Sequence, residues 1–371
     1  MEKKINLLFL VKSFGMGGVE KANIYMINQI SKEKFNIFVL YINEGMLMED
    51  LNTENIIIQK LGDKIELKSF YTVMYIAKVI SYIKKNKIEI VHTIDPTFYM
   101  IGSVAAHFSK IRHIRTQPNF IRRHEKLNTK TLKMLPFEKW TNKFITYNYA
   151  SNKDLQLAGV DSNKIETIYS FEKPEEVPLF NDIRVEFDIP KNSKVILALH
   201  RMVLLKGYET FIEMIPFIIK EYQDVCFLLV GDGPLRPELE SRVEELNIRE
   251  FVRFTGFRKD IVNIIRQVDF GVYPLADTAA MGDLLLEGKV LITKKNGAMD
   301  EYIEHNVNGF LTPDDMPETY ANYSLRLLKD EQLLENMERN RREFNLKYND
   351  NDKNLQKLEK IISSVVTGIN I

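Results

Sequence analysis

The sequence predicts an α/β protein made of two doubly wound domains, each a parallel sheet with helices on both faces. Short apolar runs alternate with segments of helical period along almost the whole chain, and this alternation is typical of parallel strands joined by crossover helices. With 371 residues the chain exceeds what one core usually covers, so we expect two domains. Residues 173–190, with their prolines and acidic residues, keep neither period and are interpreted as the linker.

The domain before the linker, residues 1–172, carries strand candidates that are short runs rich in β-branched and aromatic residues. They are residues 5–11, 35–41, 55–60, 88–92, 111–115 and 144–147. Amphipathic segments predict helices between them, at residues 20–31, 69–86 and 97–109. A more polar helix is expected from about Asn152, with Ser151 or Asn152 as its N-cap, because both offer a short side-chain oxygen to an unpaired amide.

The domain after the linker, residues 191–345, repeats this rhythm with strand candidates of the same kind. They are residues 194–199, 225–230, 252–255, 270–273 and 290–293. A strongly apolar helix is expected at residues 208–219. Three further helices are expected toward the end of the chain, at residues 324–329, 331–345 and 354–366.

Composition excludes several classes of protein. No segment reaches the run of about 20 apolar residues that a membrane-spanning helix needs. The only cysteine, Cys226, lies in the apolar run VCFLLVG, so it is expected to be a buried structural residue, and a reducing cytoplasm fits this usage. The 51 basic residues balance 51 acidic ones, which gives no reason to expect nucleic-acid binding.

One segment departs from this neutral average. Residues 105–143 contain ten lysines and arginines against Glu125 and Glu138, a net charge of +8, with aromatic and aliphatic residues between them. One interpretation is a surface that docks on anionic lipid headgroups, where each basic residue adds roughly 1 kcal/mol. The alternative is a solvated basic face whose aromatic residues belong to the core.

A glycine-rich turn follows the first predicted strand. Gly15, Gly17 and Gly18 precede a helix, so backbone amides there can approach a ligand phosphate or an acceptor closely. The alternative is ordinary turn chemistry. The turn lacks the GxGxxG fingerprint, and no convincing acidic residue ends the second strand as NAD-dependent enzymes need. We therefore expect no dinucleotide cofactor.

Five segments of the second half, taken in order, resemble a known family. They are VILALHRMVLLKGYETFIEMI, FLLVGDGPLRPELE, VRFTGF, DFGVYPL and DEYIEHNVNGFLTPDD, between residues 195 and 315. The chain resembles the GT-B fold glycosyltransferases of the retaining family 4 type over nearly its whole length, and most closely in these segments. The resemblance implies two Rossmann-like domains facing a cleft. Residues 1–172 would hold the acceptor and residues 191–345 the nucleoside diphosphate sugar.

The same resemblance implies further properties of the whole chain. Residues 346–371 are expected to form a helix that crosses back to the first domain. The expected reaction is transfer of a sugar, of the hexosyltransferase type, with retention of anomeric configuration and without a metal or other cofactor.

Arg201 and Lys206 lie just past the strand at residues 194–199, at the carboxyl edge where parallel sheets bind ligands. Fixed cations there stabilise the negative charge that develops on phosphate oxygens as the sugar leaves. The alternative is two solvated charges beside a helix start. The resemblance favours a catalytic role for both, because Lys206 and Gly207 lead into a helix as the family's RxxxxKG pattern requires.

Gly282, Asp283, Leu284 and Glu287 are the expected donor-binding residues. The resemblance implies a phosphate-cradling turn, with amides around Gly282 and Asp283, and a ribose-binding carboxylate at Glu287. The family carries two glutamates eight positions apart, and Ala279 stands where the first, which contacts the donor sugar, is expected. The connection from Glu287 to the next strand is about four residues shorter than in the family, which predicts a truncated helix.

Four further residues complete the expected site. Thr255 and Gly256 resemble the loop that contacts the nucleotide base through its backbone. Because backbone contacts do not depend on residue type, the sequence does not distinguish UDP, GDP and ADP as the donor nucleotide. UDP is the commonest donor in the class. Gln117 follows a strand where many relatives carry a histidine, and an amide can form hydrogen bonds but cannot take a proton. His92 is the other polar group expected at the cleft, although a lone histidine at a strand end is more often structural.

Two other functions stay open. The missing first glutamate and Gln117 fit a degenerate family member that serves as a binding or activating subunit of an active glycosyltransferase. A sugar-phosphate epimerase on the same fold is less well supported by the pattern. For the transferase, glycan, lipid-linked and protein acceptors are all compatible with the sequence, and analogy favours surface polysaccharide assembly at the inner face of the cell membrane.

Overall fold

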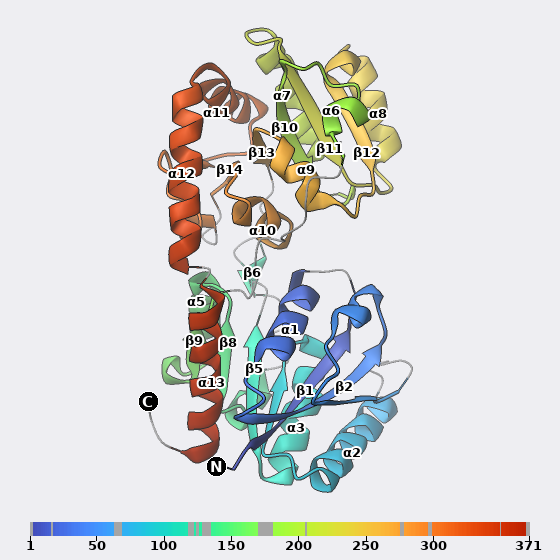
Figure 1. Cartoon of the computed structure of the whole chain (residues 1–371), viewed down its shortest axis with the longest axis vertical. Helices are drawn as coiled ribbons and strands as arrows, with labels where there is room; N and C mark the ends of the chain where they lie inside the picture. The colour runs from blue at the N-terminus through green and yellow to red at the C-terminus, as the bar shows by residue number, and fades with distance from the viewer. Residues whose placement is uncertain are drawn as a thin grey trace. The chain divides into compact units, whose positions relative to one another are not determined.

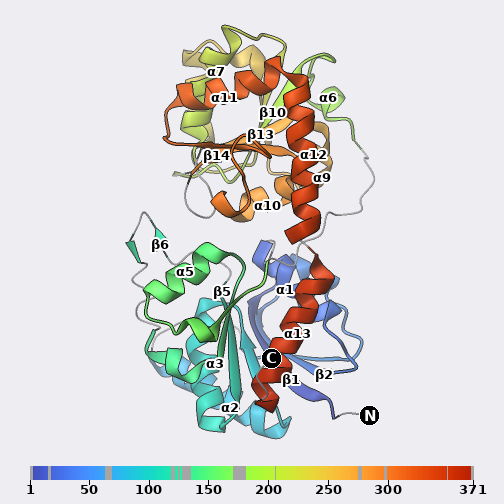
Figure 2. The ribbon, with the colours of Figure 1, turned by 90° about the vertical axis from the view of Figure 1, so that its left-hand side faces the viewer.

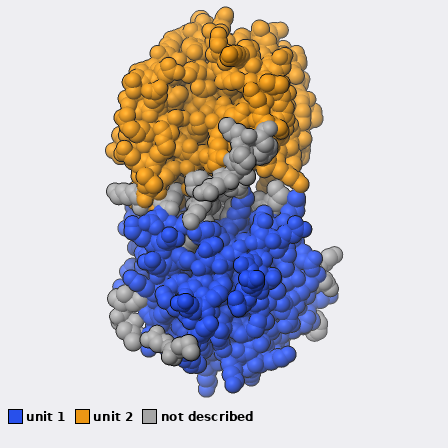
Figure 3. All heavy atoms as spheres, in the orientation of Figure 1, with its two compact units in different colours: residues 1–172, 349–371 blue, residues 173–348 orange. Residues whose placement is uncertain are grey.

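The computed structural model describes most of the chain in two compact units. Unit 1 comprises residues 1–172 and 349–371, and unit 2 residues 173–348 (Figures 1 and 3). Within them the described residues are 3–15, 18–62, 69–117, 122–123, 126–127, 135–169, 181–204, 206–274, 278–295, 299–348 and 350–368. Each unit is an α/β domain with its own parallel sheet and its own core.

The sheet of unit 1 has seven parallel strands in the order β3-β2-β1-β4-β5-β8-β9. Their bounds are β1 Ile5–Ser13, β2 Phe35–Asn43, β3 Ile56–Lys60, β4 Ile90–Thr93, β5 Arg112–Gln117, β8 Lys143–Thr146 and β9 Ile165–Thr167. A separate antiparallel pair is formed by β6 Arg122–Arg123 and β7 Lys126–Leu127. The strand order reverses between β1 and β4, and such a switch point is where doubly wound sheets bind ligands.

Helices cover both faces of this sheet because consecutive strand residues point to opposite sides. Leu8 and Leu10 pack with Val79 and Phe98 on one face, whereas Phe9 packs on the other. The helices are α1 Gly18–Gln29, α2 Ser69–Lys85, α3 Pro96–Ser109, α5 Tyr149–Leu157 and α13 Asn351–Thr367, with short 3₁₀ turns η1 Met46–Asp50, η2 Leu135–Trp140 and η3 Ser162–Lys164. Side chains of α2 and α3 pack with Leu8 and Leu10, and those of α1 and α13 pack with Phe9. Figures 1 and 2 show where these helices lie in unit 1.

Helix α13 is held to unit 1 by buried apolar and charged contacts. Leu358 and Ile362 are fully buried in the same cluster as strand β1. The Glu359 carboxylate, 7% exposed, accepts hydrogen bonds from the Ser31 amide and the Lys34 ammonium, both at 2.8 Å. The last helix of the chain is therefore part of the first sheet's packing.

The sheet of unit 2 has six parallel strands in the order β12-β11-β10-β13-β14-β15. Their bounds are β10 Lys194–Leu199, β11 Val225–Val230, β12 Val252–Gly256, β13 Phe270–Tyr273, β14 Val290–Lys294 and β15 Phe310–Thr312. The helices are α6 Ile183–Glu186, α7 Tyr208–Ile219, α8 Arg236–Glu245, α9 Ile261–Gln267, α10 Thr278–Leu286, α11 Pro317–Lys329 and α12 Glu331–Tyr348, with η4 Arg249–Phe251 and η5 Met299–Glu301. The switch point lies between β10 and β13.

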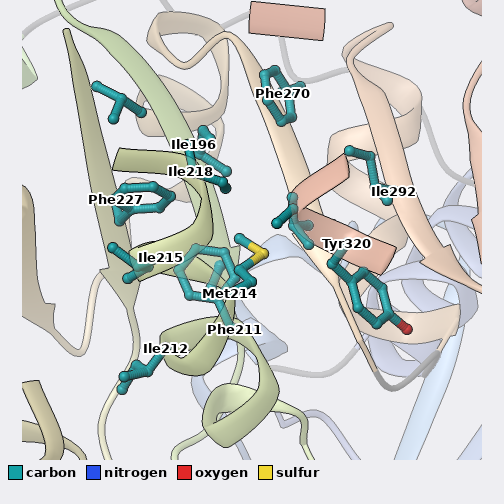
Figure 4. Close-up of a cluster of buried hydrophobic side chains, with 14 of the residues drawn as sticks. Ile196, Phe211, Ile212, Met214, Ile215, Ile218, Phe227, Phe270, Ile292 and Tyr320 are labelled. Atoms are coloured by element: carbon teal, nitrogen blue, oxygen red, sulfur yellow. The ribbon is translucent and has the colours of Figure 1, made fainter. Parts of the chain in front are cut away.

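The larger core of unit 2 lies between the sheet and helix α7. Figure 4 shows Phe211 and Ile215 of this helix among Ile196, Phe227 and other strand side chains. The opposite face of the sheet carries α9 and α10 and contains Cys226, where burial raises the pKa of the thiol to about 11. A thiol of this kind is a structural residue and a poor nucleophile.

The expected strands all occur, within two residues or so at their ends. The three-residue edge strands β9 and β15 were not predicted, because so short a run has no period to recognise. The expected cap of helix α5 was wrong. Asn148 is the N-cap, and its Oδ1 accepts the Ser151 amide at 2.7 Å, so the helix begins three residues earlier than Asn152.

Candidate functional site

The loop after β10 carries Arg201 and is interlocked with the loop after β11. The Met202 amide donates to the Asp232 carbonyl at 2.9 Å. A Cβ on Gly231 would lie 1.8 Å from the His200 carbonyl oxygen, and one on Gly233 would lie 2.3 Å from the Met202 carbonyl oxygen. The GDG sequence therefore exists because two backbones pass each other too closely for side chains, and this fixes the backbone of Arg201.

Tyr208 ties the carboxyl ends of β10 and β11 to the start of α7. Its hydroxyl accepts the His200 amide at 2.8 Å and lies 2.8 Å from the carbonyl oxygens of His200 and Val230. Burial raises the pKa of this tyrosine, so it stays a neutral donor. Gly207, in the left-handed region with φ of 79°, caps the helix that Tyr208 begins. Lys206 is thus placed at a helix N-terminus on the ligand edge of the sheet.

The two expected catalytic cations therefore share one loop at the switch point of unit 2. Arg201 is exposed and Lys206 is half-buried. Both follow β10, one of the two strands between which the strand order reverses. Their predicted position at this edge is confirmed, and their catalytic role stays a prediction.

Thr255 and Gly256 lie at the carboxyl end of the neighbouring edge strand, β12. The Gly231 amide donates to the Gly256 carbonyl at 3.0 Å, and Thr255 Oγ1 donates to the same oxygen at 2.9 Å. Gly256 has a φ of 71°, which favours glycine. The loops after β10, β11 and β12 are thus joined into one row of backbone along the ligand edge.

The expected turn at Gly282 was wrong. Gly282 is the fifth residue of α10, and in an α-helix the amide at that position pairs with the carbonyl four residues earlier. Unpaired amides at a helix start belong to its first turn, which begins at Thr278. The run from Thr278 to Leu286 contains alanine, methionine and leucine, all good helix formers, so the helix continues where the turn was expected.

The ribose-binding role expected for Glu287 is contradicted by its position. Its carboxylate, 9% exposed, pairs with the Arg266 guanidinium of α9, with N–O distances of 2.7 and 3.2 Å. Glu287 follows the end of α10 and precedes β14 by three residues, so it lies at the amino edge of the sheet, opposite Arg201. Gly288, with φ of 76°, follows the helix and β14 begins two residues later, so the short connection expected from the sequence is present.

Asp283 lies near the ligand edge. Burial raises the pKa of Tyr273, the last residue of β13, and the nearby Tyr208 and Asp283 raise it further. The half-buried Asp283 carboxylate is thus close to a hydroxyl at the end of β13. Leu284, by contrast, is fully buried in the core, where a Cβ on Gly271 would lie 2.6 Å from its Cδ1. The side chain of Leu284 therefore contacts the core and not a ligand.

The glycines expected to contact a ligand in unit 1 lie partly outside the described residues. Gly17 is one of the positions not described. Gly18 is the first residue of α1, directly after the β1 loop and next to the switch point between β1 and β4. The position of Gly18 fits the expected backbone contact.

His92 is a core residue, which corrects the expectation that it faces a ligand. It lies inside β4, is fully buried, and has Nε2 at 2.7 Å from Thr116 Oγ1 and its ring 5.2 Å from that of Phe9. Burial lowers its pKa to about 3, so the ring is neutral. The sequence pattern places a histidine near a strand end but does not tell which way it points.

Gln117 is the last residue of β5 and lies at the ligand edge of unit 1. Its Oε1 accepts a hydrogen bond from the Arg115 guanidinium, and both side chains are 5% exposed. Arg115 is one of the basic residues of the segment 105–143. Its position two residues before Gln117, on the same side of the strand, was the signal that pointed to a pair.

Some of the described basic residues of the segment 105–143 make contacts within unit 1. Lys143 pairs with Glu166 at 3.4 Å, and the Lys139 ammonium lies 5.5 Å from the centroid of the Trp140 ring. Residues 118–121, 124–125 and 128–134 lie outside the described residues, so lipid docking stays a prediction. Among the helices of the described ranges, none is long and apolar enough to cross a membrane.

Comparison with known proteins identifies the family of unit 2. Residues 180–344 match the model of the glycosyl transferases group 1, so this part of the chain is a domain of that family. The fold of the whole chain is similar to that of the Anabaena protein HepE, solved in complex with UDP and glucose. The TM-score is 0.82 at 19% identity, and the match covers 97% of this chain and 100% of that one. The fold is GT-B.

Two curated relatives are similar over shorter stretches. N-acetyl-alpha-D-glucosaminyl L-malate synthase of Bacillus anthracis is 29% identical over 192 residues, which is 50% of either chain. UDP-Gal:alpha-D-GlcNAc-diphosphoundecaprenol alpha-1,3-galactosyltransferase of Escherichia coli is 25% identical over 275 residues, 70% of either chain. The chain spans half or less of the length of the first three curated relatives it matches.

Proposed function

We propose that this chain transfers a sugar from a nucleoside diphosphate sugar to a glycan, lipid-linked or protein acceptor. A UDP-sugar is the first candidate for the donor. The observation that carries the proposal is the placement of Arg201 and Lys206 on one loop at the switch point of a glycosyl transferases group 1 domain. The interlocked glycines Gly231 and Gly233 hold that loop in place. This is the geometry that a leaving diphosphate requires.

In the proposed reaction the two cations act on the leaving group. As the bond between the sugar and the diphosphate breaks, negative charge grows on the phosphate oxygens, and fixed cations stabilise it most in the transition state. The first-turn amides of α10, which begins beside the same switch point, add partial positive charge. We propose independence of a metal, because two protein cations can supply the charge that a metal otherwise would. Retention of configuration is proposed only from the resemblance to the retaining family 4 type.

We propose that Asp283, and not Glu287, binds the ribose. The connection from Glu287 to the next strand is about four residues shorter than the family pattern requires, and Asp283 stands four residues earlier, at the family's distance. Asp283 also lies near the carboxyl end of β13, whereas Glu287 is paired with Arg266 at the other edge. Eight positions before Asp283 is Leu275, which has no carboxylate to contact the sugar.

The cellular setting is proposed from the relatives. One of them is a galactosyltransferase acting on a diphosphoundecaprenol-linked sugar, and others are lipopolysaccharide core glycosyltransferases of Rhizobium meliloti. These names support a role in surface polysaccharide assembly, with the protein in the cytoplasm and attached to the inner face of the cell membrane through residues 105–143. Thr255 and Gly256 would then contact the nucleotide base.

The test is a panel of UDP-, GDP- and ADP-sugars with the purified protein, with donor binding and hydrolysis as readouts. We expect one nucleotide to bind and to be hydrolysed, and expect Arg201→Ala and Lys206→Ala to abolish hydrolysis. Failure of every donor to bind would overturn the proposed function.

A second function is favoured by a specific observation. Neither Leu275 nor Ala279 supplies the carboxylate that the family uses on the donor sugar, which fits a subunit that binds a nucleotide without transferring sugar. Binding of a donor without hydrolysis or transfer, together with activation of a second glycosyltransferase, would support this alternative.

A further inference from the structure

Arg341 of α12 is a buried cation that no step of the proposed reaction uses. The residue is 1% exposed, and burial lowers its pKa to about 10. Its guanidinium carbon lies 4.2 Å from the centroid of the Phe344 ring. The guanidinium donates to two neutral oxygens, the Tyr302 carbonyl and Oδ1 of Asn345, the second at 3.2 Å. Burying a charge against neutral groups costs free energy, and this cost is explained if the contacts hold other elements in place.

Arg341 fixes the orientation of the Asn345 amide. A guanidinium can only donate hydrogen bonds, so Asn345 presents its oxygen to Arg341 and its NH2 group to the other side. There the NH2 group donates to the carbonyl oxygens of Leu285 and Leu286, at 2.6 and 3.1 Å. One amide thus joins the buried charge of α12 to the last turn of α10.

The two carbonyls that Asn345 contacts belong to the carboxyl end of the helix whose first turn lies at the ligand edge. The last four carbonyls of a helix lack partners within it, and a positive charge close to them is favourable because this is the negative end of the helix dipole. Helix α10 has nine residues and is about 13 Å long, so a tilt of about 5° at its anchored end moves its first turn by roughly 1 Å. The contact at the carboxyl end therefore determines where the first turn lies.

The other hydrogen bond of Arg341 reaches the segment after β14. Tyr302, whose carbonyl accepts it, directly follows η5. Helix α10 follows β13, and η5 follows β14, which is the neighbour of β13 in the sheet. Arg341 and Asn345 together hold α10, η5 and α12 in one arrangement.

We propose that Arg341 and Asn345 are positioning residues, which hold the carboxyl end of α10 so that its first turn and Asp283 stay aligned with the nucleotide of the donor. The inference rests on the proposed function, in which α10 binds the donor, and deepens it by naming residues that act on the donor site without touching the donor. Arg341 acts through Asn345, and Asn345 acts through α10. A displacement of about 1 Å in a group that binds the donor is enough to weaken binding and turnover.

The test compares Asn345→Ala with Asn340→Ala, a matched control on the same helix. Asn340 is also half-buried and also donates its amide to a backbone carbonyl, at 2.9 Å, but that carbonyl belongs to Val307, in the loop before β15. Both variants are expected to lose similar stability in urea unfolding. Only Asn345→Ala is expected to raise the Kd for UDP and the KM for the donor, by about three- to tenfold. If Asn345→Ala binds UDP as tightly as the wild type does, the inference is overturned.

Hydrogen exchange tests the same contact with no donor present. If Asn345 anchors α10, the backbone amides of α10 exchange faster in Asn345→Ala than in the wild type, and at the wild-type rate in Asn340→Ala. Unchanged exchange of α10 in Asn345→Ala would contradict the inference.

Asn345→Asp separates the contact with α10 from the contact with Arg341. A carboxylate still accepts from Arg341 but has no hydrogen to donate to the two carbonyls. This variant is therefore expected to lose affinity for UDP as Asn345→Ala does, and it decides the question if Asn345→Ala does not fold. Wild-type affinity in Asn345→Asp would mean that Asn345 serves only to pair with Arg341, which overturns the inference.

The two proposals fail in distinguishable ways. Wild-type protein that binds no donor refutes the proposed function before any variant is made. A wild type that binds and hydrolyses a donor and depends on Arg201, but keeps its affinity for UDP in Asn345→Ala, refutes only the role of Arg341 and Asn345.

Discussion

The two sheets of this protein share one topology but use their carboxyl edges in opposite ways. In unit 2 the cations Arg201 and Lys206 are exposed or half-buried on loops fixed backbone to backbone. In unit 1 Arg115 and Gln117, toward the carboxyl end of β5, are almost fully buried and are paired with each other. A group that neutralises ligand charge must face the ligand, whereas a group that holds another in place can be buried. If the proposed function holds, the edge of unit 2 supplies charge to the ligand and the edge of unit 1 does not.

The largest effect is expected at the exposed edge. Arg201→Ala should lower donor hydrolysis about 100- to 1000-fold, because a fixed group that stabilises developing charge is removed. Thermal stability should not change, since the side chain is exposed and its backbone is held by other contacts. Lys220→Ala, an exposed lysine at the other end of α7, is the matched control and should keep wild-type turnover. Equal losses of donor hydrolysis in both variants would mean that the position of Arg201 at the ligand edge gives it no special role.

The backbone interlock predicts the next largest effect, on stability. Gly231→Ala should cost about 3 kcal/mol or more, because the new Cβ meets the His200 carbonyl oxygen and neither backbone can move away easily. Gly159→Ala is the control. Gly159 also has positive φ, at 94°, but nothing lies within 4 Å of the added carbon, so only the conformational cost of about 1 kcal/mol is expected. Urea unfolding of both variants measures the difference, and similar costs would mean that the loops are not interlocked.

The two carboxylates near α10 should separate binding from stability. Asp283→Asn is expected to weaken donor binding about tenfold with little effect on unfolding, because a charge-assisted hydrogen bond to ribose is lost. Glu287→Gln is expected to leave donor binding unchanged and to cost about 1 to 3 kcal/mol, because Arg266 loses its charged partner. Calorimetric titration with UDP and urea unfolding test both. The reverse result would restore the ribose role to Glu287.

The elements of this fold were predictable where their period was long. Strands such as β10 and β11 are runs of six apolar residues, and helix α7 is apolar over three turns, so local sequence and tertiary packing agree. The position of Arg201 and Lys206 was predictable for the same reason, since they follow a recognisable strand. The roles of Glu287 and His92 were not. A side chain at a helix end or a strand end can lie at either edge or on either face of the sheet. A shift of a few residues in the alignment is enough to assign it to the wrong edge.

The pair Arg115 and Gln117 shows a different limit of sequence analysis. Both residues were noted, Arg115 for its charge and Gln117 for the absence of a histidine. That they touch depends on the alternation of side chains along β5 and on the burial of both. A buried arginine is uncommon, so the composition of the segment favoured a solvated charge, and only the packing of Tyr99 against it contradicts that interpretation.

The smallest predicted effect concerns the pH dependence of unit 1. Burial holds the pKa of His92 at about 3 in the folded chain, below the ordinary value near 6.5 in the unfolded chain. Below pH 6.5 the unfolded chain therefore binds the extra proton, and folding stability falls as the pH falls. His113 contributes in the same direction. These buried imidazoles leave folding stability unchanged above about pH 6.5, and the penalty they impose on the folded state grows as the pH falls from there to about pH 3.

His92→Gln isolates this contribution, because an amide keeps a hydrogen bond to Thr116 but does not titrate. The wild type should lose stability relative to the variant by about 1.4 kcal/mol for each pH unit below 6.5. Urea unfolding at pH 7, 6 and 5, followed by a probe in unit 1, measures the difference between the two proteins at each pH. Parallel curves would mean that His92 takes up its proton as readily in the folded chain as in the unfolded chain. That result would contradict a neutral ring buried between Phe9 and Thr116.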